Sequence, residues 1–201
     1  MTLDPARTAV LALHWQVNVI EPHGFFGGML AAPVAESGVV ARAAAFHARA
    51  GELGVPVFFT RFTVPEDEGG LVRNTGFMQA VGEAQDAFRP DAPGAALIDA
   101  MTVTERDSVV DNQRLSGLAA SPLPERLAER GIDTVLVTGV ATNLTVEQTA
   151  RHGTDLGLVV HVVSDCVAAA DEATHQASLA NLALATAGCL TSAEALERLA
   201  G

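Results

Sequence analysis

Runs of apolar residues bounded by polar residues or glycine recur along the chain. Such runs are typical of parallel strands that are buried on both faces of a sheet. The pattern predicts five strands and a very short sixth, at Thr8–Leu13, Val55–Thr60, Asp107–Asp111, Thr134–Thr138, Leu158–Val163 and Cys189–Leu190.

Stretches with helical spacing of apolar residues separate these runs. They cover Pro33–Glu52, Pro122–Arg130, Asn143–His152 and Asp171–Ala187, and the last three are each followed by a glycine, a plausible helix stop. Thr191, with Glu194 three residues later, predicts a capped final helix. The alternation of strands and helices predicts one α/β domain over residues 1–201. It is expected to be a three-layer, Rossmann-like α/β/α fold with a mostly parallel six-stranded sheet.

The segment Phe62–Arg106 does not fit this alternation. It is rich in acidic residues, proline and glycine, and it is too long for a simple connection. We expect one short helix and a loop over the active face, with a surface insertion of no functional role as the alternative.

Composition narrows the classes of function. The chain carries 12 Lys+Arg against 24 Asp+Glu, a net charge of −12, and all the basic residues are arginine. So acidic a chain is a poor partner for nucleic acid or an anionic membrane. The lack of lysine excludes Schiff-base chemistry, P-loop phosphate binding and a lysine base. A small molecule is therefore the expected partner.

The compartment follows from the cysteines and the N-terminus. Cys166 and Cys189 cannot form a disulfide framework or a C-x-x-C site, and Cys166 is expected to be buried and inert. Residues 1–7 do not resemble a secretory signal, and no apolar run is long enough to span a membrane. We expect a cytoplasmic protein.

Polar residues follow the predicted strands. Parallel sheets bind ligands beyond the carboxyl ends of their strands, where these side chains would converge. The turn after the fourth strand, GVATNLTVE, would also present free backbone N–H groups that can stabilise an oxyanion. Candidate pocket residues, by position after the strands, are His14, Trp15, Gln16, Arg61, Phe62, Asp111, Asn112, Arg114, Val140, Ala141 and Thr145.

The segment TVLVTGVATNLTVEQTARHGTDLGLVVHVVSD resembles the G-V-x-T-N-x-C-V-x-x-T-A-R segment of the isochorismatase-like hydrolase superfamily, which includes nicotinamidases. HWQVNVI resembles that family's D-x-Q-N-D-F, and the R-x-S pattern at Arg114 and Ser116 resembles its K-x-R-x-S-A-F. The resemblance covers Thr8 to about Asp171. It implies the family's isochorismatase-like fold and, commonly, a homo-oligomer, a dimer or tetramer.

The resemblance implies a catalytic aspartate, lysine and cysteine, and this sequence has His14, Asn112 and Thr145 at those positions. It also implies a non-proline cis peptide, matched here by Val140-Ala141. Nicotinamidases bind a metal through an Asp-x-His pair and a later histidine. No histidine lies between His47 and His152, so we expect no such metal, and we expect no cofactor.

The substituted residues leave several functions open. The first is an enzyme that acts on a small organic molecule by acid/base chemistry, with His14 as the acid or base. Vinyl-ether cleavage, with His14, Asp111 or Glu147 as proton donor, is one form of it, and a different lyase, isomerase or cyclisation reaction is another. The second is a catalytically silent member that binds a metabolite or serves as a subunit. The third is an amidohydrolase with Thr145 as nucleophile, His14 as base and Asn112 as orienter.

Binding roles are expected for the remaining candidates. Arg61 would pair with a substrate carboxylate, or alternatively form a salt bridge with Glu66, Asp67 or Glu68. Trp15 and Phe62 would form apolar walls of the pocket. Gln16, Asp111, Arg114, Val140 and Ala141 complete the set of predicted substrate contacts.

Overall fold

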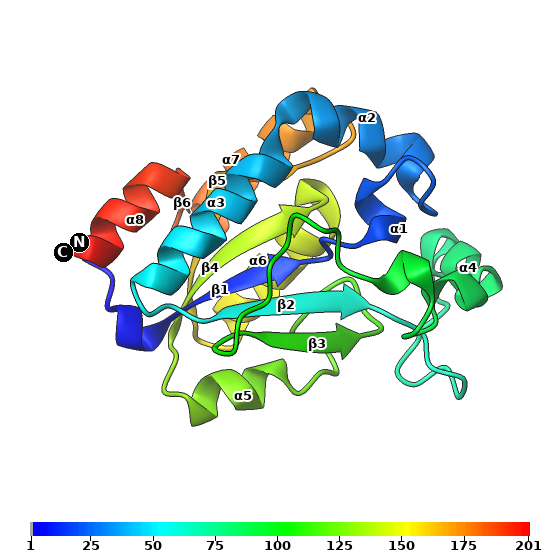
Figure 1. Cartoon of the computed structure of the whole chain (residues 1–201), viewed down its shortest axis with the longest axis horizontal. Helices are drawn as coiled ribbons and strands as arrows, with labels where there is room; N and C mark the ends of the chain where they lie inside the picture. The colour runs from blue at the N-terminus through cyan, green and yellow to red at the C-terminus, as the bar shows by residue number, and fades with distance from the viewer. Residues whose placement is uncertain (1) are drawn as a thin grey trace.

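Six parallel strands form one sheet in the order β3-β2-β1-β4-β5-β6 in the computed structural model, which describes residues 2–201 (Figure 1). All five strand pairs are parallel, as the alternation of elements predicts. The strands are β1 Thr8–Leu13, β2 Val57–Phe62, β3 Ser108–Asn112, β4 Thr134–Val140, β5 Val159–Ala168 and β6 Cys189–Leu190.

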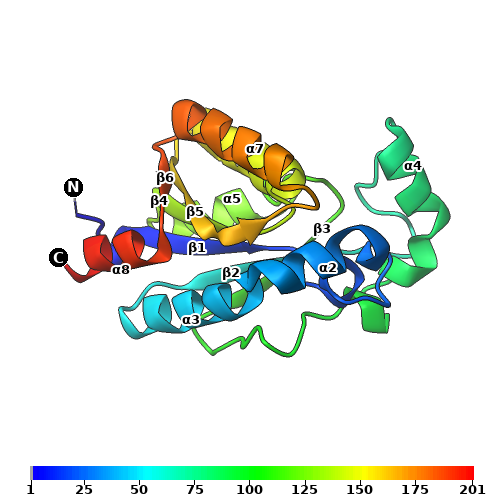
Figure 2. The same cartoon turned by 90° about the horizontal axis from the view of Figure 1, so that it is seen from above.

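Helices cover both faces of the sheet and confirm the predicted α/β fold with its three layers (Figure 2). On one side lie α2 Gly27–Ser37, α3 Val39–Glu52 and α8 Ser192–Ala200. On the other lie α5 Leu123–Glu129, α6 Glu147–Asp155 and α7 Glu172–Ala185. Beyond the carboxyl ends of β2 and β3 lies α4 Gly76–Glu83, while the short α1 Val17–Ile20 follows β1 (Figure 1).

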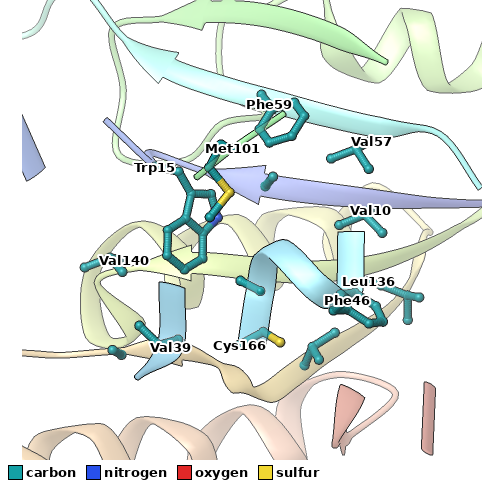
Figure 3. Packing of buried hydrophobic residues seen from close by; sticks show 14 of the residues in the cluster. Val10, Trp15, Val39, Phe46, Val57, Phe59, Met101, Leu136, Val140 and Cys166 are labelled. Atoms are coloured by element: carbon teal, nitrogen blue, oxygen red, sulfur yellow. The ribbon is translucent and has the colours of Figure 1, made fainter. Parts of the chain in front are cut away.

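Two hydrophobic cores result from the alternation of side chains along each strand. In β1, Val10 and Ala12 face the α3 side, where they pack in a cluster with Phe46 of α3 and Leu136 of β4 (Figure 3). The intervening residues of β1 face the cluster with α5, α6 and α7. Every residue of β1 is buried, so this strand forms the centre of the molecule.

Several element boundaries differ from the predicted ones. The helix expected over Pro33–Glu52 is broken at Gly38, whose φ of 65° only glycine adopts readily, so α2 and α3 are separate helices. The turn after β4 begins with a π-helical segment, Thr142–Val146, before α6. Within Phe62–Arg106 there is one α-helix, α4, with two short 3-10 segments, Gln85–Phe88 and Pro93–Ala95. The capping box of Thr191 and Glu194 is present at α8.

No single helix among residues 2–201 is long and apolar enough to cross a membrane. By length and composition, α2 and α3 meet the requirement only as a pair, which is bent by 67°.

His47 of α3 is a polar side chain that lies within the hydrophobic core. Its Nε2 is 2.9 Å from the Thr138 hydroxyl, and its ring packs edge-on against Trp15 and Phe59. Burial lowers the pKa of His47 to about 4, because the charged ring would lose its hydration there.

Acidification is therefore expected to destabilise the fold below pH 6.5. Between pH 6.5 and 4, the unfolded chain binds a proton at His47 that the folded chain does not, so stability falls as pH falls. At pH 5 the loss from His47 is about 2 kcal/mol. Urea unfolding at pH 7 and pH 5 measures it.

The variant His47→Gln should lose less stability over this interval than the native chain. His23→Gln, at an exposed histidine, is the matched control and should retain the native pH dependence. Equal pH dependence in all three proteins would contradict a neutral, buried His47.

Candidate active site

The carboxyl ends of β1 and β4 lie side by side at the centre of the sheet, where Leu13 pairs with Gly139. The strand order changes direction at this point, and such switch points are where α/β sheets bind ligands. A pocket of about 40 Å³ lies here, with His14 and Thr145 as the polar side chains in its wall. The structure thus brings together two of the three predicted catalytic residues in one cavity.

The backbone at His14 positions its ring. The φ angle of His14 is 54°, a left-handed conformation that histidine adopts uncommonly, and its N–H donates to the Thr60 carbonyl at 3.1 Å. This turn interrupts the alternation of β1. Trp15 therefore joins the hydrophobic cluster on the α3 side (Figure 3), whereas His14 lies in the pocket wall with 6% of its surface exposed.

Asn112, at the end of β3, contacts the imidazole. Its Oδ1 is 3.3 Å from His14 Nε2, and its Nδ2 donates to the carbonyls of Arg114 at 2.6 Å and Ser116 at 3.2 Å. These two carbonyls fix the orientation of the amide, so Oδ1 faces the ring as an acceptor. His14 Nε2 must then carry the proton, and Nδ1 is left with its lone pair.

The charge of His14 follows from its burial. Removal from water lowers the pKa of His14 to about 4, and the hydrogen bond with Asn112 only partly opposes this shift. The ring is therefore neutral at pH 7. A neutral imidazole with an unprotonated Nδ1 can accept a proton or a hydrogen bond, but it does not supply the proton of an imidazolium.

Thr145 lies in the π-helical segment after β4 and is buried. Its hydroxyl donates to the carbonyl of Leu115 at 2.7 Å, and no hydrogen bond joins it to His14 within residues 2–201. Thr145 therefore connects the β4 turn to the loop after β3. The peptide bond Val140-Ala141, at the start of the same turn, is cis, as the resemblance implies.

The rest of the pocket wall is apolar. Val140, Ala141 and Leu144 come from the β4 turn, and Leu115 comes from the loop after β3. The opposite side is formed by side chains around α1 and α2 and by one residue of α4, namely Val19, Phe26, Met29, Leu30 and Phe77. The rings of Phe26 and Phe77 are stacked, with centroids 5.3 Å apart and planes within 6°. We call this pair the aromatic roof.

Three predicted pocket residues are structural supports instead of pocket walls. Trp15 donates to the Thr138 hydroxyl at 3.4 Å and is fully buried in the core. Gln16 accepts from the Phe62 N–H at 2.6 Å and donates to the carbonyls of Phe62 and Ala95. Phe62 packs edge-on against the His14 ring, with centroids 6.1 Å apart.

The predicted charged contacts also lie outside the pocket wall. Arg61 binds Asp111 through two hydrogen bonds of 2.8 and 2.9 Å. The alternative salt bridge to Glu66, Asp67 or Glu68 was therefore assigned to the wrong partner, because β2 and β3 place Arg61 opposite Asp111. Arg114 extends toward Gly70 of the inserted segment.

The pattern of the sequence did not reveal Met29 and Phe77 as wall residues. Their place depends on contacts between α2 and α4, which are far apart in the chain, and nothing local distinguishes them from core residues. The segment Phe62–Arg106 was expected to cover the active face. Phe77, which belongs to this segment, agrees with that expectation.

Other candidate sites are weaker. A larger groove of about 690 Å³ lies between α3 and residues 100–107, at the amino ends of β2 and β3 and away from His14. Among residues 2–201, no group of three or more His, Cys, Asp or Glu side chains is arranged to hold a metal ion. Cys166 is buried, and burial raises the pKa of its thiol to about 12.

Comparison with known proteins gives consistent matches. The isochorismatase domain family matches residues 8–194. Ureidoacrylate amidohydrolase RutB of Methylobacterium radiotolerans is 30% identical over 194 residues, which is 90% of this chain and 75% of that protein. Nicotinamidase 3 of Arabidopsis thaliana is 34% identical over 132 residues, 64% of this chain and 63% of that protein. The structure of a cysteine hydrolase from Pseudomonas syringae has a TM-score of 0.85 at 25% identity, covering 100% and 95% of the two chains.

Replacing Asn112 by aspartate tests the contact with His14. A carboxylate at this position would favour the charged ring, so Asn112→Asp should raise the pKa of His14 from about 4 by about 1 to 3. NMR titration of the imidazole protons measures the pKa.

Asn181→Asp, at an exposed position of α7, adds the same charge elsewhere and should leave the pKa of His14 unchanged. If both variants gave the native pKa, Asn112 would not be the partner of the ring.

Proposed function

The chain belongs to the isochorismatase family, and we propose that it acts on a small organic molecule by acid/base chemistry without a cysteine nucleophile. The observation that supports this most is the state of His14. The ring is neutral, its tautomer is set by Asn112, and within residues 2–201 its Nδ1 makes no hydrogen bond. At the wall of a cavity, such a ring is in its proton-accepting form near neutral pH, and its low pKa makes it a weaker base than a histidine that titrates near 7.

The relatives named for amide substrates favour a carbonyl compound with a nitrogen leaving group. In the proposed reaction, Nδ1 of His14 accepts a proton from a water molecule while the water oxygen attacks the carbonyl carbon. The imidazolium then returns this proton to the leaving nitrogen as the C–N bond breaks. Backbone N–H groups at the start of the turn Thr142–Val146 are the proposed donors to the oxyanion.

Asn112 and Thr145 have positioning roles in this proposal. Asn112 holds the ring, and Thr145 holds the Leu115 carbonyl and thereby the loop that carries the Asn112 acceptors Arg114 and Ser116. Since the Thr145 hydroxyl proton is directed at a backbone carbonyl, the geometry supports His14 as a base over Thr145 as a nucleophile.

Vinyl-ether cleavage receives less support. It requires a proton donor, and no carboxylic acid is among the residues that form the pocket wall. Asp111 and Glu147, the acids suggested by the sequence, pair with Arg61 and Arg151 respectively.

A second candidate function is ligand binding without catalysis. The observation that favours it is the small volume of the pocket, about 40 Å³. It agrees with the expectation from the resemblance that His14, Asn112 and Thr145 stand in place of the family's aspartate, lysine and cysteine. Ligand pockets commonly have volumes of roughly 300 Å³ or more, so this one is small for an organic substrate.

Turnover of a panel of small amides and ureido compounds tests the proposed chemistry. We expect His14→Gln to reduce kcat/KM by about 100-fold or more, since a positioned base contributes on the order of 10²–10⁴. Thr145→Ser and Thr145→Val should both retain the larger part of the activity.

The pH dependence of kcat/KM is a second test of His14 as the base. Activity needs the neutral ring, so kcat/KM should fall only as the pH drops through about 4, well below the range of an ordinary histidine. Full activity in His14→Gln would refute the base. An acyl ester trapped on Thr145 in mass spectrometry, together with loss of activity in Thr145→Val, would instead indicate a hydroxyl nucleophile.

A further inference from the structure

We infer that the pocket accepts an uncharged, largely apolar ligand, and that Phe77 of the aromatic roof limits its size. This rests on the proposed function in one respect only, namely that the pocket at His14 is the site of substrate binding. It goes further by stating which chemical class of molecule the wall can hold.

The polarity of the wall determines which ligand charge the pocket can accept. Nine of the eleven wall residues are apolar, and the two polar ones are His14 and Thr145. His14 is neutral at pH 7, and Thr145 uses its hydroxyl proton on the Leu115 carbonyl. An ionised group placed here would lose its hydration and find no opposite charge among the wall residues.

Neither Arg61 nor Arg114 is among the residues of the pocket wall. Arg61 forms two hydrogen bonds with the carboxylate of Asp111, which pairs its charge. Arg114 is the one with a charge to spare, since its Nη1 is buried without a hydrogen-bond partner within residues 2–201, but its side chain lies outside the wall and its Nη2 lies toward Gly70. The net charge of −12 further disfavours the approach of an anion. A carboxylated substrate therefore gains nothing from its charge at this site, whereas a neutral amide needs only hydrogen bonds to its polar end.

The aromatic roof limits the size of the ligand. The volume of about 40 Å³ is far below the roughly 300 Å³ or more that ligand pockets commonly have, so a larger ligand needs part of the wall to be displaced. The Phe26 N–H donates to the Asn18 carbonyl at 2.8 Å, which fixes that side of the roof. Phe77 belongs to α4 and is partly exposed. It stacks on Phe26, which belongs to a different segment of the chain. Phe77 is therefore the side chain whose displacement or removal enlarges the pocket.

Binding of matched probes to the full chain tests both statements. Butyramide is neutral, succinamate carries the same amide with a carboxylate at the other end, and benzamide is neutral but larger. Calorimetry gives the affinities, and the NMR signals of the His14 ring report whether binding occurs at the pocket.

We expect butyramide to bind at least ten times more tightly than succinamate in the native chain. Phe77→Ala should improve benzamide binding by ten-fold or more and leave the preference for neutral ligands intact. Phe25→Ala is the control, because Phe25 packs on Phe26 but lies outside the pocket wall. It should bind all three probes as the native chain does. Phe77→Leu, which keeps an apolar side chain, should be intermediate and covers the case in which Phe77→Ala does not fold.

Two outcomes would overturn the inference. One is succinamate binding as tightly as butyramide with a shift of the His14 signals. The other is no binding of any neutral probe to the native chain, Phe77→Ala or Phe77→Leu. Because binding is measured apart from turnover, the two proposals fail separately. Neutral amides that bind without being hydrolysed support this inference and refute base catalysis, whereas hydrolysis of succinamate in preference to butyramide does the reverse.

Discussion

The hydrogen bond between Asn112 and His14 is the contact on which the proposed chemistry of the site depends. It links the ends of β3 and β1, which are separated in the sheet by β2. The two amide protons of Asn112 are held by main-chain carbonyls, so the amide has one orientation and the ring one tautomer. In the proposed function, Asn112, at a position where the resemblance implies a lysine, acts through its shape and polarity, without charge.

The apolar surroundings of the ring explain three properties together. They lower the pKa of His14, they leave an incoming charge without a partner, and they strengthen any hydrogen bond made inside the cavity. Charged side chains near the carboxyl ends of the strands pair with one another outside the pocket, as Arg61 and Asp111 do. The molecule is strongly acidic as a whole, but its central cavity is electrically neutral.

The sequence predicted the sheet well because apolar runs and glycine stops are local signals. β1 and the cap of α8 lie where the pattern placed them. The break at Gly38 was missed, since alanine-rich spacing continues across it and only the backbone angle reveals the turn. The position of Trp15 was misjudged for a similar reason, because the left-handed residue before it changes which side of the sheet it faces.

The site was predictable to the extent that it lies at strand ends. His14, Val140, Ala141 and Thr145 share one cavity because parallel strands end at one edge. The aromatic roof was not predictable, because stacking of Phe26 on Phe77 depends on how an inserted segment folds back over the sheet. Gln16 was predicted to contact the ligand because it follows a strand. Its amide instead forms hydrogen bonds with backbone groups.

Those backbone contacts have an evolutionary consequence. Gln16 holds the main chain at Phe62 and Ala95, and Asn18 holds it at Ala87 and Phe25. None of these bonds involves the side chains of the residues that are held. The inserted segment is therefore held at its base through its main chain. One requirement on its own sequence is Gly94, where a Cβ would collide with Oδ1 of Asn18. Mutation can diversify the covering of the cavity, and with it the choice of molecule, while the frame beneath stays as it is.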